Sequence, residues 1–130
     1  MSEIPTINLG YATTDVFGLL HAQIESIGEK IDIAQYNTKL LLTLEDFYKL
    51  ISHPIVKGDI HNVNILKSSG LVVTKINGEY FGLMIKGESS VEQSGFVCEK
   101  ITADRQYGVM GLHRETFPIN FGGEQHGSKN

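Results

Sequence analysis

The sequence predicts an α+β fold in which two N-terminal helices pack on a mainly antiparallel sheet, either curled or built in two layers. Apolar residues recur at helical spacing in the first part of the chain and alternate with a period of two after residue 55. An Asn-Gly pair at residues 77–78 separates two runs rich in β-forming residues. We expect one domain over residues 1–121, because 130 residues bury one hydrophobic core but not two. Residues 122–130 lack an apolar anchor and are expected to form a flexible tail.

A first amphipathic helix is predicted over residues 15–31. The sequence Thr-Thr-Asp at residues 13–15 supplies oxygens that can cap the free backbone N–H groups at its start. The apolar residues that recur at helical spacing are Val16, Leu20, Ile24, Ile27 and Ile31. Two of these residues, Leu20 and Ile27, are seven positions apart, and Ala34 and Leu41 continue that spacing. Two alternatives stay open: the helix ends near Lys30, which we favour, or it continues to Leu41 as a coiled-coil-like seam.

A second helix is predicted after Thr43, whose hydroxyl can cap the first turn. Glu45 and Asp46 follow, and their negative charges favour the positive N-terminal end of a helix. The predicted apolar face consists of Leu44, Phe47, Tyr48 and Ile51. Pro54 should end this helix, because the residue before a proline is driven towards an extended conformation.

The β half of the domain is expected from Ile55 onward, and its clearest element is a hairpin of residues 71–76 and 79–85. The Asn-Gly turn between the two runs predicts a two-residue loop, because both residues of such a turn must adopt a positive φ angle. This turn sets Ile76 opposite Glu79, Thr74 opposite Phe81 and Val72 opposite Leu83. We therefore expect a defined register along the whole hairpin.

Both faces of this hairpin carry apolar side chains, whereas a sheet with one face in water needs only one apolar face. The predicted helices are too few to cover both faces. Later strands are expected after the polar stretch 87–95, at about 96–103, 107–113 and 117–121. Either these strands form a second layer, or the protein self-associates.

Charge and cysteine content narrow the classes of function. Fifteen acidic residues against eleven basic ones give a net charge of −4, which disfavours nucleic-acid binding. The longest apolar runs, such as 40–42 and 83–85, are far too short to span a bilayer, and no signal-peptide pattern occurs, so we expect no membrane segment. Cys98, the single cysteine, can form no intrachain disulfide; we expect a structural, reduced thiol and a cytoplasmic location.

The five histidines form no HxxxH, HxH or Cys/His pattern, so we predict no metal site and no cofactor. Asp59 and His61 would point the same way in an extended segment, where the carboxylate could orient the imidazole as a general base. The alternative, which we favour, is a polar turn or strand edge. Asp59, His61 and His113 are nevertheless the candidate catalytic residues of a small hydrolase.

Arg105 and Arg114 are the only arginines of the chain. Together with Tyr107 and His113 they are the candidate ligand-binding residues, because guanidinium forks bind phosphate or carboxylate and tyrosine stacks on rings. In a hairpin of the later strands, Arg105 would lie at the turn and Arg114 at the far end, so convergence on one anion would need curvature or a second subunit. The alternative is two surface residues paired with Glu99 or Glu115.

Three functions are compatible with these patterns. We favour a small non-enzymatic binding protein of accessory or inhibitor type, which acts through a partner-protein surface and self-associates. The second is a protein that binds or sequesters a nucleotide or other small anion, and the third is the small hydrolase. A non-enzymatic role is preferred because the chain has no nucleophile elbow and no phosphate-binding or dinucleotide-binding glycine motif.

Overall fold

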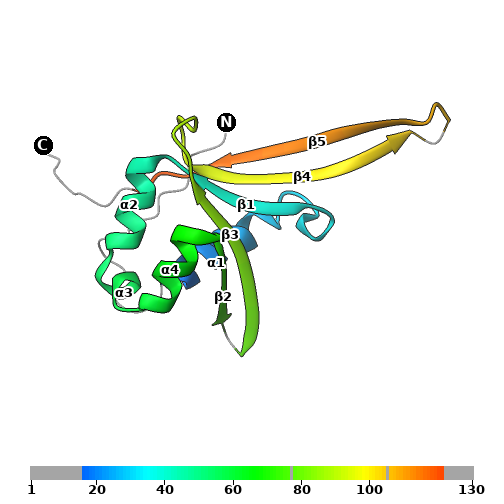
Figure 1. The fold of residues 1–130 in the computed structure, drawn as a ribbon. Helices are drawn as coiled ribbons and strands as arrows, with labels where there is room; N and C mark the ends of the chain where they lie inside the picture. The colour runs from blue at the N-terminus through cyan, green and yellow to red at the C-terminus, as the bar shows by residue number, and fades with distance from the viewer. Residues whose placement is uncertain (1–15, 77, 105, 122–130) are drawn as a thin grey trace, which may run out of the picture.

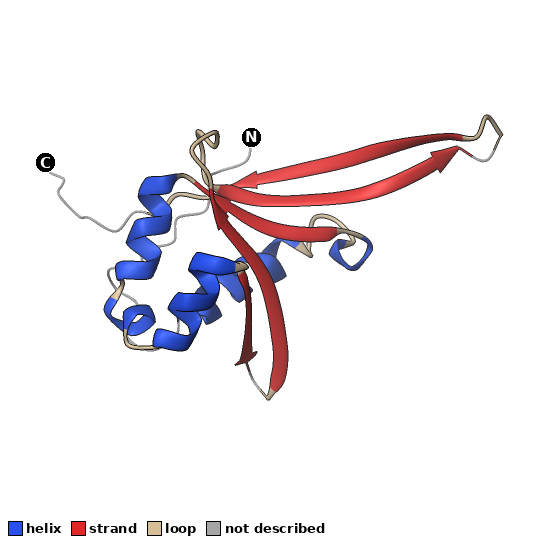
Figure 2. Ribbon diagram, in the orientation of Figure 1, coloured by secondary structure: helices blue, strands red, loops and turns tan. Residues whose placement is uncertain are grey.

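The computed structural model describes residues 16–76, 78–104 and 106–121, and these residues confirm the predicted α+β class. The elements in chain order are α1 (Val16–Ile27), η2 (Ile33–Gln35), β1 (Asn37–Leu42), α2 (Leu44–Ser52), α3 (Pro54–Lys57), α4 (Ile60–Ser68), β2 (Leu71–Ile76), β3 (Glu79–Gly87), β4 (Gly95–Asp104) and β5 (Val109–Pro118). Figure 2 shows the helices gathered around one part of the sheet and the strands extending away from it.

The strands form one open sheet in the order β2-β3-β1-β4-β5. β1 lies in the centre, parallel to β3 and antiparallel to β4, and the other pairs are antiparallel. The two hairpins, β2–β3 and β4–β5, diverge from this centre (Figure 1). A right-handed twist of about 20–25° between neighbouring strands accounts for the divergence. All the described strands therefore belong to a single sheet, and the predicted alternative of two strand layers is not observed.

The core lies between the helices and one face of this sheet, which we call the inner face. The sheet contributes Leu40, Leu42, Val72, Leu83, Ile85, Phe96 and Cys98, and the helices contribute Val16, Leu20, Ile27, Leu50, Val56 and Leu66. Side chains alternate between faces along a strand. The residues between the core positions, such as Leu41 and Val97, therefore point to the opposite, outer face.

The first helix ends at Ile27, close to the favoured boundary near Lys30. Its continuation to Leu41 is wrong, because residues 37–42 form the central strand β1. Leu40 and Leu42 are both fully buried on the inner face, so two strand neighbours and the core override the spacing of seven. The proposed cap at residues 13–15 lies outside the described residues.

The second helix is confirmed: the Thr43 hydroxyl accepts a hydrogen bond from the Asp46 N–H at 3.1 Å, and the helix ends at Ser52. The expected start of the β half at Ile55 is wrong, because α3 and α4 follow. Pro54 occupies the first turn of α3, where its missing N–H has no cost. Asp59 caps the start of α4. Local capping thus favours helices where we expected strands.

The hairpin of β2 and β3 has the predicted register, with Ile76 opposite Glu79 and Val72 opposite Leu83. Gly78 has a φ angle of +86°, as the turn requires; residue 77 lies outside the described residues. The two later strands are confirmed as β4 and β5, but a separate strand at 117–121 is wrong. Phe117 and Pro118 end β5, and the buried Ile119 follows it into the core. The expected tail, residues 122–130, is outside the description.

Candidate functional site

The far half of the β4–β5 hairpin is a two-stranded ribbon, which we call the arm. β1 pairs with β4 only as far as Glu99, opposite Asn37, whereas β4 continues to Asp104. Residues 100–104 and 109–113 therefore pair only with each other among the described strands. The arm projects beyond the rest of the molecule (Figure 1). A two-stranded ribbon alone is marginally stable in water at best, so this projection needs an additional source of stability.

The outer face of the arm is apolar. Ile101 is opposite Leu112 and Ala103 is opposite Met110, and opposed residues of an antiparallel pair share a face. The three large side chains are exposed by 64% for Ile101, 58% for Leu112 and 69% for Met110. Neighbouring apolar side chains thus face solvent together, in a pattern that is typical of an interaction surface.

A cluster of ion pairs lies on the outer face at the base of the arm. Arg114 Nε donates a hydrogen bond to Glu99 Oε2 at 2.8 Å, and Lys39 Nζ lies 3.7 Å from Glu99 Oε1. The hydrogen bond from Arg114 lowers the pKa of the Glu99 carboxyl most, and the charge of Lys39 lowers it further against the opposing effect of burial. The cluster links β1, β4 and β5 where the arm begins.

The inner face of the arm base is covered by Tyr36, which follows η2. Lys100 Nζ lies 4.8 Å from the centre of the Tyr36 ring, and the ring centroids of Tyr36 and His113 are 6.0 Å apart. His113 Nε2 is also 2.8 Å from Glu115 Oε2. At the base of the arm the inner face therefore has contacts within the chain. Farther along, Val109 and Thr102 of the inner face are exposed, and the outer face is the one that carries several large apolar side chains.

The candidate ligand-binding residues are spread along the β4–β5 hairpin. His113 and Arg114 are consecutive in β5 and point to opposite faces. Tyr107 lies in the turn at the tip, roughly 20 Å from Arg114 at the usual rise per strand residue. Arg105 is outside the described residues. The Arg114 guanidinium is paired with Glu99, as in the alternative above, and an anion site shared by these residues stays a prediction that needs a second subunit.

The candidate catalytic residues are not arranged as an extended Asp-x-His group would require. Asp59 Oδ1 accepts the Asn62 backbone N–H at 3.1 Å and Oδ2 accepts the Asn62 side-chain amide at 2.9 Å. His61 lies in the first turn of α4 and is exposed, whereas His113 lies on the arm. The extended segment on which the catalytic hypothesis depends is not observed, because Asp59 caps α4 and His61 is helical.

No three His, Cys, Asp or Glu side chains gather in a way that could hold a metal ion within the described ranges. The Cys98 thiol is buried, and the Thr38 hydroxyl lies 3.5 Å from its sulfur. Burial raises the pKa of this thiol more than the contact with Thr38 lowers it. Cys98 is thus a protonated core residue. Over the described residues, no helix has the length and apolar character needed to cross a membrane.

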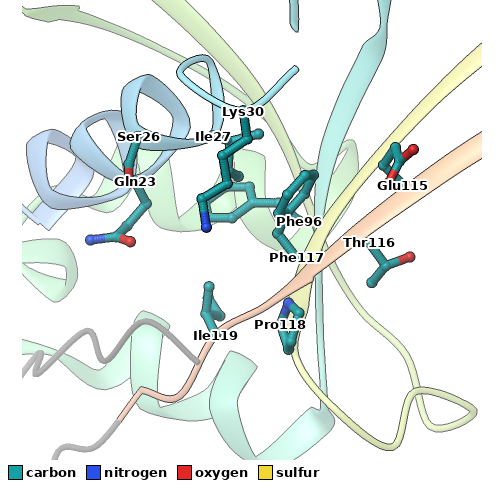
Figure 3. Close-up of a pocket in the computed structure, with 10 residues that line it drawn as sticks. All are labelled: Gln23, Ser26, Ile27, Lys30, Phe96, Glu115, Thr116, Phe117, Pro118 and Ile119. Atoms are coloured by element: carbon teal, nitrogen blue, oxygen red, sulfur yellow. The ribbon is translucent and has the colours of Figure 1, made fainter. Parts of the chain in front are cut away.

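A cavity of about 280 Å³ lies between α1 and the end of β5. Figure 3 shows Gln23 of α1 and Lys30, which lies in the turn after α1, on one side of it and Ile119 on the other. Phe96 and Ile27 form part of its apolar lining. Its volume is slightly below the range of about 300–1,000 Å³ that is usual for ligand sites, and its polar groups do not converge on one point. The cavity is therefore a weaker candidate than the arm.

Sequence reasoning missed the apolar outer face of the arm, although a signal was present. Ile101 and Ala103 alternate with the polar Thr102 and Asp104 along β4, and in β5 Leu112 lies between Gly111 and His113. Alternation shows that these residues share a face, but not that the helices cover the opposite one. Comparisons with protein-family models, curated proteins and solved structures gave no match. The outer face of the arm therefore carries the functional argument.

Proposed function

We propose that this chain is a small non-enzymatic binding protein of accessory or inhibitor type, which acts through a partner-protein surface and self-associates. The observation that supports it is the exposed apolar face of Ile101, Met110 and Leu112 on a ribbon of only two strands. Covering this face would remove apolar surface from water and stabilise the ribbon at the same time. The proposed occupant of the face is a second copy of the chain.

The energy available from this face fits a reversible association. Full burial of an Ile, Leu or Met side chain stabilises by roughly 1.5–3 kcal/mol. Because about two-thirds of each of the three arm side chains is exposed, complete burial of one contributes about 1–2 kcal/mol, and the upper limit for two copies is about 6–12 kcal/mol. Association costs about 4–15 kcal/mol. The two ranges overlap, so we expect an assembly that depends on protein concentration rather than a permanent one.

Local charge does not prevent a second copy from binding at the apolar part of the arm. The chain carries a net charge of −4, which opposes association of two copies in general. Ile101, Ala103, Met110 and Leu112 carry no charge, so this part of the outer face adds no repulsion between two copies. At the base of the arm Glu99 pairs with two cations, Arg114 and Lys39, so that cluster keeps one net positive charge.

The environment of Cys98 supports a reducing compartment. Its thiol is buried beneath the helices and has no second cysteine with which to pair. Disulfide-stabilised folds belong to oxidising compartments, whereas reduced, buried thiols are usual in the cytoplasm. We place the protein there as part of this proposal.

Size-exclusion chromatography with light scattering tests the proposal. We expect the wild-type mass to rise with concentration to at least twice the chain mass of 14.4 kDa. Leu112→Thr keeps a good strand residue but removes apolar surface from both copies, so the assembly should weaken at least tenfold. Ile60→Thr is the matched control, because Ile60 is also 70% exposed but lies on α4. A wild-type chain that stays monomeric up to millimolar concentration would refute the proposal.

A further inference from the structure

β5 is one of the two edge strands of the sheet, and its free side faces away from β4. An edge strand presents a row of unpaired backbone N–H and C=O groups, which another strand can join. Proteins block such edges with charged side chains, proline, bulges or short strands. Whether β5 is blocked therefore decides whether it can pair with another chain.

The base of β5 is blocked and the arm half is open. His113, Arg114 and Glu115 are consecutive ionisable residues, and Pro118 ends the strand. Residues 109–112 read Val-Met-Gly-Leu, with no charge and no proline, and they pair with β4 in an unbroken register. The opposite edge, β2, has only six residues, and one of them is Lys75. Beyond Glu99 the arm half of β4 also has an unpaired side, but its residues include the charged Lys100 and Asp104. The uncharged open edge is therefore the arm half of β5.

A glycine lies in the middle of this open edge. Gly111 is exposed and its φ angle is not among the positive ones, so no turn requires a glycine here. The only atom that an added Cβ would approach within 4 Å is the Thr102 hydroxyl oxygen, at 3.2 Å, and that side chain can rotate. Glycine inside a strand often marks a place where another backbone approaches closely.

We propose that β5 pairs antiparallel with β5 of a second copy, with Gly111 on the twofold axis; this inference rests on the self-association proposed above. Met110 then faces the partner's Leu112, and Leu112 faces the partner's Met110. The two arms become one four-stranded ribbon, which exceeds the three strands that a ribbon with an apolar face needs for stability. Their outer faces join into one apolar face, on which Met110 and Leu112 bury part of their surface against the partner's side chains while Ile101 stays exposed. The interface is isologous, so the assembly closes as a dimer.

Neighbouring registers are less favourable. An axis at Leu112 would place Met110 opposite the partner's Arg114, and an axis at Met110 would place Leu112 opposite the partner's Gly108. An axis between two residues would merge the outer face of one copy with the inner face of the other. The register centred on Gly111 makes two Met-Leu pairs and keeps Arg114 away from the apolar side chains.

A charge-swap experiment tests this register. In Gly111→Lys or in Gly111→Glu alone, like charges face each other across the axis, so each variant should elute at the monomer mass of 14.4 kDa. An equimolar mixture of the two should form a heterodimer of twice that mass. Thr116→Lys and Thr116→Glu are the matched controls, because Thr116 is an exposed residue of β5 far from the axis. Each of them should dimerise like the wild type.

Recovery on mixing separates charge repulsion from misfolding, because two misfolded variants would not restore each other. A second readout is oxidation of Gly111→Cys, since residues opposed across an antiparallel pair lie about 4.5–5.5 Å apart, within disulfide range. We expect a cross-linked dimer from Gly111→Cys and none from Thr116→Cys. Suppose that wild type dimerises, that Gly111→Lys and Gly111→Glu each dimerise without the other, and that Gly111→Cys does not cross-link. The edge pairing is then wrong, and the proposed function stands. A monomeric wild type refutes both.

Discussion

Ser94 anchors the start of β4 to the start of α2, and its replacement gives the most direct measure of that connection. Its side chain is 1% exposed. The Ser94 hydroxyl accepts the Thr43 backbone N–H at 3.0 Å and donates to Asp46 Oδ2 at 2.5 Å. In Ser94→Ala the Thr43 N–H loses its acceptor, and the Asp46 carboxylate loses one donor.

The expected cost follows from these two bonds. A donor left unsatisfied away from water costs about 1–3 kcal/mol, and a hydrogen bond to a charged group contributes about 1.5–3 kcal/mol. The Asp46 carboxylate still has Lys49 Nζ at 3.8 Å and is partly exposed to water. Losing the hydrogen bond from Ser94 to Asp46 should therefore cost an amount near the low end of its range. We expect Ser94→Ala to lower the free energy of unfolding by about 2.5–4.5 kcal/mol.

Urea denaturation of wild type and Ser94→Ala measures this cost. Ser90→Ala is the control, because Ser90 belongs to the same connection between β3 and β4 but is exposed. The control should change the free energy of unfolding by no more than about 0.5 kcal/mol. If Ser94→Ala also falls within that range, the connection between α2 and β4 does not stabilise the fold as argued.

Three further predictions concern single sites. Gly78→Val should lower the free energy of unfolding, measured by urea denaturation, by more than about 1 kcal/mol, because a β-branched residue resists the φ angle of +86°. Gly70→Ala should lower it similarly or more, since its φ is +81° and an added Cβ would lie 2.6 Å from the Ile85 carbonyl oxygen; either variant with wild-type stability would contradict the backbone described. The hydrogen bond from Arg114 lowers the pKa of Glu99 in the folded protein. The contribution of Glu99 to the free energy of unfolding is therefore fully present above the pKa of an unfolded glutamate, about 4.3, and is lost as the pH falls through the pKa of the folded state. Glu99→Gln should remove this loss of stability below about pH 4.3 in urea titrations. An unchanged pH profile would show that the ion pair with Arg114 contributes nothing.

Local chemistry explains which elements were predictable from the sequence. The register of the β2–β3 hairpin and the Thr43 cap each depend on residues within four positions of one another, and both are as predicted: Ile76 lies opposite Glu79, and Thr43 caps α2. α4 was predictable by the same reasoning, because Asp59 can cap it and Ile60, Val63 and Leu66 follow at a spacing of three. The polar residues between them, read as strand alternation, obscured that pattern.

β1 was not predictable, because its neighbours lie far along the chain. Leu40 pairs with Ile85 on one side and Phe96 on the other, about half the chain away. A short apolar run such as residues 40–42 is equally compatible with a helix until those partners are known. The same holds for the arm: the alternation of Ile101 and Leu112 is visible in the sequence, but the end of β1 at Asn37, which leaves them uncovered, is not.

The central claim is that a second copy covers the arm, and hydrogen exchange at several protein concentrations tests it most directly. A bare two-stranded ribbon opens easily, whereas strands inside a four-stranded ribbon are protected. We predict that the amides of residues 100–104 and 109–113 exchange more slowly as the concentration and the measured mass rise, while those of β2 and β3 keep their rates. Arm amides that exchange equally fast at every concentration would contradict the claim.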